Sequence, residues 1–188
     1  MSLGQLSDYK SALKNYLKGI ELFQKELNTI NDHERRNKIN DSISSAYASL
    51  AELYMNTPLC DEKNAEKKCE EYLNKGMEYN PNSLDVLLQL SNLRIIRCRD
   101  DEALQYMEKI YSHILACLES GSVEFPSEDI LSNLAKNYSE LEKYSKAIRL
   151  YDILIKMNDE NVKINLFRLS IGTSSLSIIS NFIIINMR

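Results

Sequence analysis

Small and aromatic residues recur at fixed intervals near the end of the chain, and this spacing limits the fold more than any other feature. Glu128 can be numbered as position 1 of a 34-residue unit. The matching positions are then Leu134 at 7, Ala135 at 8, Tyr138 at 11, Tyr144 at 17, Ala147 at 20, Tyr151 at 24 and Leu154 at 27. Small residues at 8 and 20 let two antiparallel helices approach closely, and the aromatic residues fill the space around that contact. The unit is therefore predicted to be a helical hairpin.

Two earlier units and the first residues of the chain follow the same spacing. The unit that starts at Leu84 has Arg94 at position 11 in place of an aromatic residue, and its matching positions are Leu90 at 7, Ser91 at 8, Ala103 at 20, Met107 at 24 and Ile110 at 27. The unit that starts at Ser44 matches in its first helix, and its second helix comes six residues late, after the insertion N-T-P-L-C-D-E-K-N. Pro81 is predicted to end that second helix, because proline has no backbone N–H and disfavours a helical residue before it. The N-terminal residues match only the second half of a unit, with Tyr9 at 17, Ala12 at 20, Tyr16 at 24 and Gly19 at 27.

These positions define the tetratricopeptide repeat, in which each unit is a pair of helices. Only five glycines and three prolines occur among 188 residues, a composition that favours long helices. The chain is therefore predicted to be all-α, a right-handed superhelical array of antiparallel helical hairpins over residues 1–170. The predicted parts are a half repeat at 1–27, repeats at about 44–81, 84–118 and 128–159, a lone first helix at 162–170 and a non-repeat apolar tail at 171–188.

Two connecting segments lengthen the array beyond regular repeats. Asn28 to Asn40 is polar and charged, so it either continues the preceding helix or forms a solvated linker. Glu119 to Ser127 contains a glycine and a proline and is predicted to be a loop. Ser127 is expected to cap the helix that follows.

The last residues differ in composition from the rest of the chain. From Ile171 onwards, Arg188 is the only charged residue. Ile178 to Ile185 is apolar, but it is too short and too polar for a clear membrane span. Three interpretations stay open: a foreign tail from truncation or an altered reading frame, a segment that packs over the last helix, or a membrane anchor. Together with the half repeat at the start, the tail suggests an excerpt of a longer scaffold, with no membrane contact unless the tail inserts.

The sequence lacks the components of a catalytic or metal site. No phosphate-binding loop, dinucleotide fingerprint, hydrolase elbow or zinc-protease motif occurs, and the cysteines form no C-x-x-C pair. The chain is therefore predicted to be no enzyme and to use no cofactor and no metal. Its four cysteines, expected to be reduced and buried or half-buried, are Cys60, Cys69, Cys98 and Cys117.

The first helices of the hairpins are predicted to line a concave groove that binds a peptide. In this repeat geometry, positions 2, 5, 9, 12 and 13 of each first helix face the groove. The candidate partner-binding residues are Glu52, Met55, Asp85, Leu88, Asn92, Ile95, Asp129, Ser132 and Glu140. Such a mixture suits a basic protein segment with a few apolar anchors, unless the apolar members pack against neighbouring repeats. No repeat has lysine at 5 together with asparagine at 9, the pair that clamps an acidic chaperone tail.

The charge distribution also favours a basic protein partner over nucleic acid. The formal net charge is −4, and residues 100–142 hold ten acidic residues against two lysines, a local net charge of −8. This stretch either attracts a basic partner or is only a solvated face. Direct binding of nucleic acid is not expected, because the tyrosines at positions 11, 17 and 24 are packing residues. These predicted core residues are Tyr54, Tyr138, Tyr144 and Tyr151.

Several strings between Leu3 and Leu169 resemble one branch of the repeat superfamily, the dedicated assembly chaperones of large-subunit ribosomal protein four. The strings are L-G-Q-L-S, A-L-K-N-Y-L-K-G-I, L-A-E-L-Y-M, L-C-D-E-K-N-A-E-K-K-C-E-E and L-S-N-L-R-I-I-R-C-R-D-D-E-A. The inserted L-C-D-E run is the most specific, since an ordinary repeat has no such insertion. The resemblance implies a non-enzymatic scaffold in ribosome biogenesis that shields a basic loop of its client and accompanies it from cytoplasm to nucleus. The alternative is a generic tetratricopeptide adaptor in another multiprotein complex.

Overall fold

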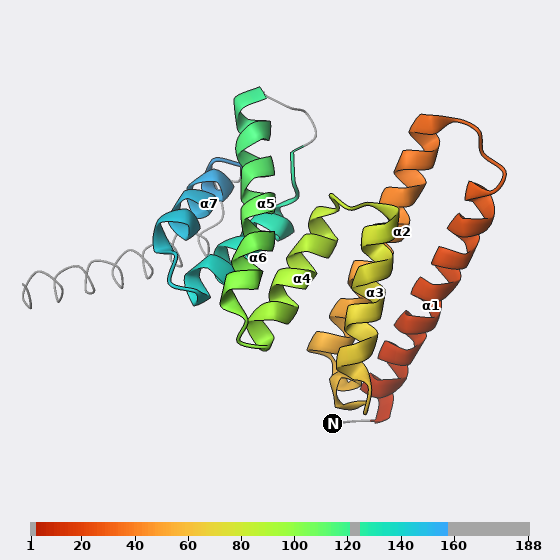
Figure 1. Ribbon diagram of the computed structural model, residues 1–188. Helices are drawn as coiled ribbons and strands as arrows, with labels where there is room; N and C mark the ends of the chain where they lie inside the picture. The colour runs from red at the N-terminus through yellow and green to blue at the C-terminus, as the bar shows by residue number, and fades with distance from the viewer. Residues whose placement is uncertain (1–2, 121–124, 158–188) are drawn as a thin grey trace, which may run out of the picture. The chain divides into compact units, whose positions relative to one another are not determined.

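The computed structural model describes residues 3–120 and 125–157, and helices dominate this part of the chain (Figure 1). In chain order they are α1 (Leu3–Leu27), α2 (His33–Asn56), the 3-10 helix η1 (Pro58–Asp61), α3 (Ala65–Tyr79), α4 (Leu84–Ile96), α5 (Asp100–Ser120), α6 (Glu128–Glu140) and α7 (Tyr144–Met157). No strand occurs in the described ranges, in agreement with the all-α prediction. The predicted helix at 162–170 and the tail at 171–188 lie outside the described residues.

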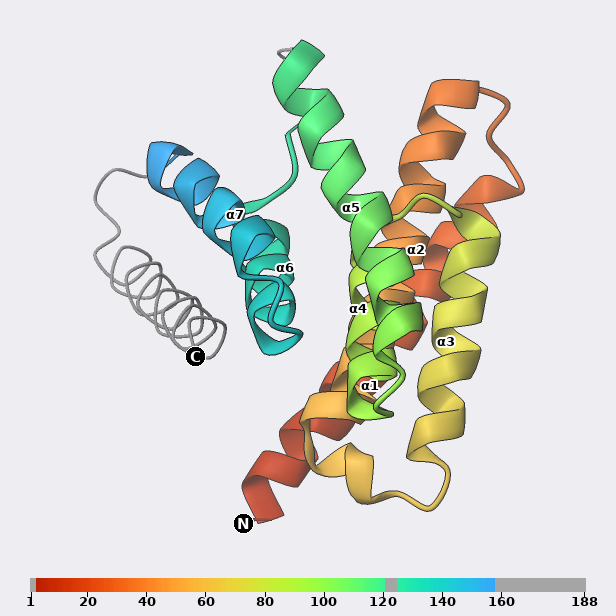
Figure 2. The ribbon, with the colours of Figure 1, turned by 60° about the vertical axis from the view of Figure 1, so that its left-hand side comes forward.

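The chain divides into two compact units, Met1–Tyr111 and Ser112–Arg188. In the first unit α2 packs against α1, α3 and α4, and Figure 1 shows α1, α2 and α3 side by side. In the second unit α6 and α7 pack as a pair (Figure 2). Each unit is thus built from neighbouring helices in the manner of helical-hairpin repeats.

Serine side chains start two of the first helices. The hydroxyl of Ser83 accepts a hydrogen bond from the backbone N–H of Val86 at 3.5 Å, and α4 begins at the next residue. Ser127 accepts from the N–H of Ile130 at 3.4 Å, which confirms its predicted capping of α6. Such caps satisfy backbone donors that have no partner inside the helix.

Helix α2 begins earlier than the repeat spacing predicts, so Asn28 to Asn40 does not continue α1, and only its first residues, up to Asp32, form the predicted solvated linker. The chain turns between Leu27 and Asp32, and α2 starts at His33. The carboxylate of Asp32 accepts from the N–H of Glu34 at 3.2 Å, which caps the new helix. Arg36 donates to the carbonyl of Leu27 at 2.7 Å and to that of Ile30 at 2.9 Å. These local bonds close the turn and allow the polar segment to be helical.

The core of the first unit depends on a close approach at Gly76. A Cβ atom placed there would lie 2.7 Å from Cγ2 of Val86 and 3.4 Å from both the carbonyl oxygen of Ser44 and Cβ of Tyr47. The hydroxyl of Ser44 donates to the carbonyl of Gly76 at 2.9 Å. Only glycine leaves room for α2 and α4 at this distance from α3. Gly19, at the corresponding repeat position in α1, has no heavy atom within 4 Å of its would-be Cβ.

Tyrosine rings join α2 to the neighbouring helices. The ring of Tyr47 stacks on those of Tyr72 and Tyr79, with centroids 6.1 and 6.0 Å apart. Gln24 of α1 donates to the hydroxyl of Tyr79 at 2.8 Å. Burial is the main cause that raises the pKa values of Tyr47 and Tyr72 above the ordinary tyrosine value.

The α6–α7 pair places small residues where its two helices meet. Ala135 and Ala147, at positions 8 and 20, are fully buried, as are Tyr138 and Leu154. The ammonium group of Lys146 lies 5.4 Å from the centre of the Tyr138 ring, within the range of a cation–π contact. The second unit therefore has the close helix contact that the spacing predicts.

Two tight turns share one backbone geometry. Cys98, between α4 and α5, has φ 53°, and Glu142, between α6 and α7, has φ 57°. The N–H of Arg99 donates to the carbonyl of Arg94 at 2.9 Å, and the N–H of Lys143 donates to that of Tyr138 at 2.7 Å. This is the Schellman pattern, which ends a helix with a left-handed residue.

The cysteines do not all have the environment predicted for them. Cys69 and Cys117 are buried, but Cys60 and Cys98 are exposed. Cys60 belongs to the inserted η1 segment, and Cys98 occupies the left-handed position of a turn. Both therefore lie where the chain departs from the helix faces that pack, and the prediction of burial is wrong for these two.

Candidate protein-binding surface

The first unit places predicted binding residues on two adjacent first helices. Glu52 and Met55 belong to α2, and Asp85, Leu88, Asn92 and Ile95 belong to α4, which packs against α2. A hydrogen bond of 2.5 Å links the two helices, from the hydroxyl of Ser45 to the carboxylate of Asp85. The remaining candidates, Asp129, Ser132 and Glu140, lie on α6 in the second unit.

These residues differ in how much of their surface a partner could touch. Glu52, Asp129 and Glu140 are exposed, whereas the half-buried candidates are Met55, Asp85, Asn92, Ile95 and Ser132. Leu88 is only 4% exposed. Met55 also packs against the core cluster of the first unit. Glu52 is therefore the most accessible of the candidates on α2 and α4, and Leu88 contributes little.

An exposed isoleucine adds apolar area at the end of α4. Ile96, at position 13 of its repeat, is 61% exposed, the highest value among the large apolar side chains of the described residues. Its neighbour Ile95 is half-buried. Carboxylates at Glu52 and Asp85 together with Ile95 and Ile96 give this surface both negative charge and apolar anchors.

A network of ion pairs links α3, α4 and α5. Arg94 contacts Glu70 of α3 at 3.2 Å and Glu102 of α5 at 3.0 Å. Arg97 contacts Glu66 at 2.6 Å and Glu70 at 3.3 Å. Hydrogen bonding by Arg97 is the main cause that holds the pKa of Glu70 below the usual glutamate value.

This network was not anticipated from the repeat spacing. Arg94 occupies position 11, where an aromatic residue is usual. Its partners lie 24 and 8 residues away in the sequence, on other helices. The acidic residues Glu70 of α3 and Glu102 of α5 are the sequence signal from which these ion pairs could have been predicted. Because Glu102 pairs with both Arg94 and Arg99, part of the acidic stretch is already neutralised.

Three of the four predicted core tyrosines are too deeply buried to form a stacking platform. Tyr54, Tyr138 and Tyr151 are buried, as predicted, and Tyr144 is half-buried. Burial raises the pKa of Tyr151 to about 12. A stacking platform needs open ring faces, so these three buried rings are structural.

Cysteine and acidic side chains in the described part of the chain form no group suited to a metal ion. The thiol of Cys69 donates to the carbonyl of Ala51 at 3.4 Å, and burial raises its pKa to about 11. Such a thiol is poorly reactive, because the thiolate is the nucleophilic form. Among the described helices, none has the length and apolar character needed to cross a bilayer.

Comparison with known proteins identifies one curated relative. A Schizosaccharomyces pombe protein named "Probable assembly chaperone of rpl4" is 29% identical over 159 residues. The match covers 84% of this chain and 46% of that protein, so the chain spans about half the length of its relative. No family model matches the chain.

Solved structures show the same fold. The structure of the assembly chaperone of RpL4, residues 1–338, superposes with a TM-score of 0.73 at 16% identity, over 96% of this chain and 65% of that one. A thermophilic tetratricopeptide-repeat protein from Thermus thermophilus superposes with a TM-score of 0.50 at 16% identity, over 89% and 96% of the two chains. The protein is thus a tetratricopeptide-type helical array whose sequence resembles that of a curated assembly chaperone of rpl4.

Proposed function

We propose that this protein is a non-enzymatic scaffold that binds a basic segment of large-subunit ribosomal protein four and shields it during ribosome assembly. The observation that carries this proposal is the 29% identity over 159 residues to a protein named as an assembly chaperone of rpl4. The proposed role includes work in both cytoplasm and nucleus, because a ribosomal protein is made in one compartment and assembled in the other.

The α2–α4 surface supports a basic client. Glu52 and Asp85 would attract lysine and arginine side chains and speed their encounter with the scaffold. Ile95 and Ile96 would then bury apolar residues of the same segment, which would give specificity that charge alone lacks. A ribosomal segment in this position would be kept from nonspecific contacts with RNA until assembly.

The test is isothermal titration of the full chain with the isolated basic loop of ribosomal protein four. Affinity should fall several-fold as salt rises from about 0.05 to 0.3 M, because added ions screen exposed charges. Glu52→Lys should weaken binding by roughly fivefold or more. Glu71→Lys is the matched control, since Glu71 is an exposed glutamate on α3.

Equal losses in the two variants, or binding that does not respond to salt, would contradict the proposed surface. Failure to bind the loop at any salt concentration would favour the alternative role, a general adaptor in another multiprotein complex. Capture of proteins from lysate by the full chain would then identify the complex.

A further inference from the structure

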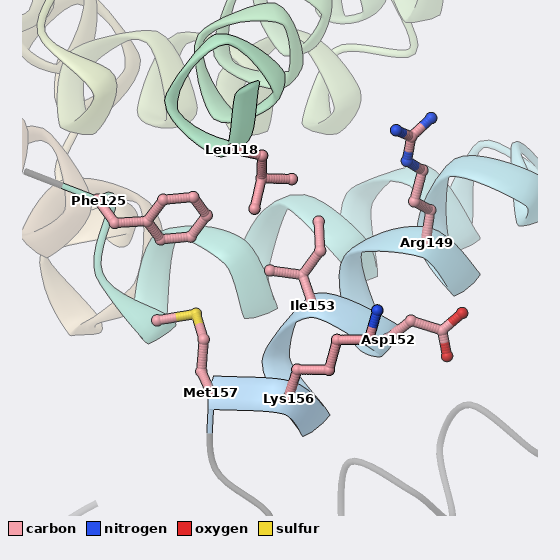
Figure 3. A pocket seen from close by; sticks show the side chains of 7 residues that line it. All are labelled: Leu118, Phe125, Arg149, Asp152, Ile153, Lys156 and Met157. Atoms are coloured by element: carbon pink, nitrogen blue, oxygen red, sulfur yellow. The ribbon is translucent and has the colours of Figure 1, made fainter. Parts of the chain in front are cut away.

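The second unit contains an apolar pocket that the proposed client surface does not use. Its volume is about 520 Å³, within the range of pockets that enclose ligand groups. Figure 3 shows Leu118 at the end of α5 and Phe125 in the following connection, facing Ile153 and Met157 of α7. These four side chains form the apolar part of the pocket.

Two of the apolar lining residues are unusually accessible. Leu118 is 46% exposed and Met157 is 44% exposed, whereas Ile153 is buried. Burial of apolar surface stabilises by about 25 cal/mol for each Å² removed from water, and the exposed parts of these side chains do not gain this free energy. A bound apolar group would recover part of it, which distinguishes this pocket from isolated apolar residues on a surface.

The pocket is a departure from the regular repeat. Helix α5 has 21 residues, whereas α3 has 15. Leu118 and Phe125 both lie beyond residue 117, where a 34-residue unit that starts at Leu84 would end. One wall of the pocket therefore comes from residues that a regular repeat does not possess.

Charged side chains border the pocket on one side of α7. Figure 3 shows Arg149, Asp152 and Lys156 along this helix, beside the apolar residues. Asp152 offsets one of the two positive charges, so the border carries a net charge of about +1 by simple counting. The whole chain has a formal charge of −4, and the proposed client surface is acidic. The pocket thus has the opposite charge preference.

We infer that this pocket is a second docking surface, which binds a protein segment that presents a bulky apolar side chain next to a carboxylate. The apolar side chain enters between Leu118, Phe125 and Met157, and the carboxylate pairs with Arg149 or Lys156. Charge complementarity selects this occupant over a basic segment, which Arg149 and Lys156 would repel. The two surfaces therefore accept different partners, whatever the identity of the basic client.

The test uses the full 188-residue chain and two labelled peptides that share a central Leu-Phe pair. One peptide carries glutamates on both sides of the pair and the other carries lysines. Fluorescence anisotropy at low salt should show the acidic peptide binding at least about tenfold more tightly. Leu118→Glu and Met157→Glu should each weaken the acidic peptide by about tenfold or more, because both place a carboxylate in the pocket.

Charge reversal at the border supplies the decisive comparison. The double variant Arg149→Glu, Lys156→Glu should remove or reverse the preference for the acidic peptide. Lys143→Glu is the control, because Lys143 is exposed in the α6–α7 turn and does not line the pocket. Circular dichroism of each variant verifies that the helices remain.

Three results would overturn the inference. The first is equal binding of the two peptides, and the second is an acidic preference that the double charge reversal leaves unchanged. The third is no binding of the acidic peptide to the full chain, which would assign the pocket to residues that follow Met157 or to a second copy. Light scattering after size-exclusion chromatography separates these last two occupants.

Discussion

The side chain of Arg94 is 10% exposed and lies between carboxylates from two other helices. Glu70 and Glu102 contact it at 3.2 and 3.0 Å. A charge in this position is costly unless its partners remain, so the network is sensitive to the loss of one carboxylate. Glu70 serves both Arg94 and Arg97 and is therefore the residue whose removal should matter most.

Glu70→Gln is expected to lower the free energy of unfolding by about 1–2 kcal/mol at neutral pH. The value lies below that for a fully buried pair because the Glu70 side chain is 39% exposed. Its pKa is lowered on folding, so its stabilising effect is present above the unfolded pKa and is lost as pH falls through the folded value. Urea unfolding at several pH values should show the difference from wild type shrinking below about pH 4.5.

Glu71→Gln provides the comparison for that measurement. Glu71 pairs with Lys67 at 3.7 Å on an exposed face of α3, and such pairs contribute little. A loss at Glu71 as large as that at Glu70, or a Glu70 effect that persists unchanged at about pH 3, would contradict the role assigned to the network.

Gly19 and Gly76 lie at corresponding repeat positions, and their replacement by alanine is expected to change the stability of the protein in opposite directions. Gly76→Ala should destabilise the protein by about 1–3 kcal/mol, because the new Cβ would lie 2.7 Å from a buried valine. Gly19→Ala should stabilise it by about 0.5–1 kcal/mol, because alanine favours the helix and the site has open space. Thermal unfolding of both variants tests the pair, and stabilisation by Gly76→Ala would contradict the close packing.

At the scale of whole elements, the repeat spacing predicted some helix ends better than others. Helices α4 and α6 begin at Leu84 and Glu128, because serine caps coincide with the start of the apolar pattern. The start of α2 could not be found in the same way. Its first turns face solvent and carry few apolar residues, so the spacing has no signal there, and the cap at Asp32 decides the boundary.

The same limit applies to the depth of burial within the candidate surface. Helical spacing correctly groups Glu52, Asp85 and Ile95 on first helices that adjoin one another. It does not show how closely a neighbouring helix covers each side chain, and Leu88 is buried for that reason. The repeat spacing also could not predict the pocket beside α7, because that pocket depends on the length of α5 and the position of Phe125.

The two left-handed turns provide a prediction about elements. Glu142 has φ 57°, a conformation that costs a non-glycine residue about 1 kcal/mol or more. Glu142→Gly is therefore expected to raise the free energy of unfolding by about 0.5–1 kcal/mol, after the greater freedom of glycine in the unfolded chain is included. Glu140→Gly, two residues earlier within α6, should lower it by about 1 kcal/mol. Equal changes in melting temperature would contradict this assignment.

For the molecule as a whole, the fold could be predicted from the sequence more completely than the candidate binding surfaces. Close helix contacts require small residues at regular positions, and Ala51, Ala135 and Ala147 are all fully buried. A binding surface has no comparable constraint, because its residues need only reach a partner. The acidic stretch illustrates the difficulty, since Glu102 belongs to it by sequence yet pairs within the protein.

The boundary between the two units lies at Tyr111 and Ser112, in the middle of α5. The peptide bonds there are part of a helix, and Ile110, Tyr111 and Ile114 are buried. A protease must take hold of an extended, accessible stretch of backbone, so this junction offers it no ready point of attack. Proteolytic cutting at this junction would therefore require α5 to unwind first.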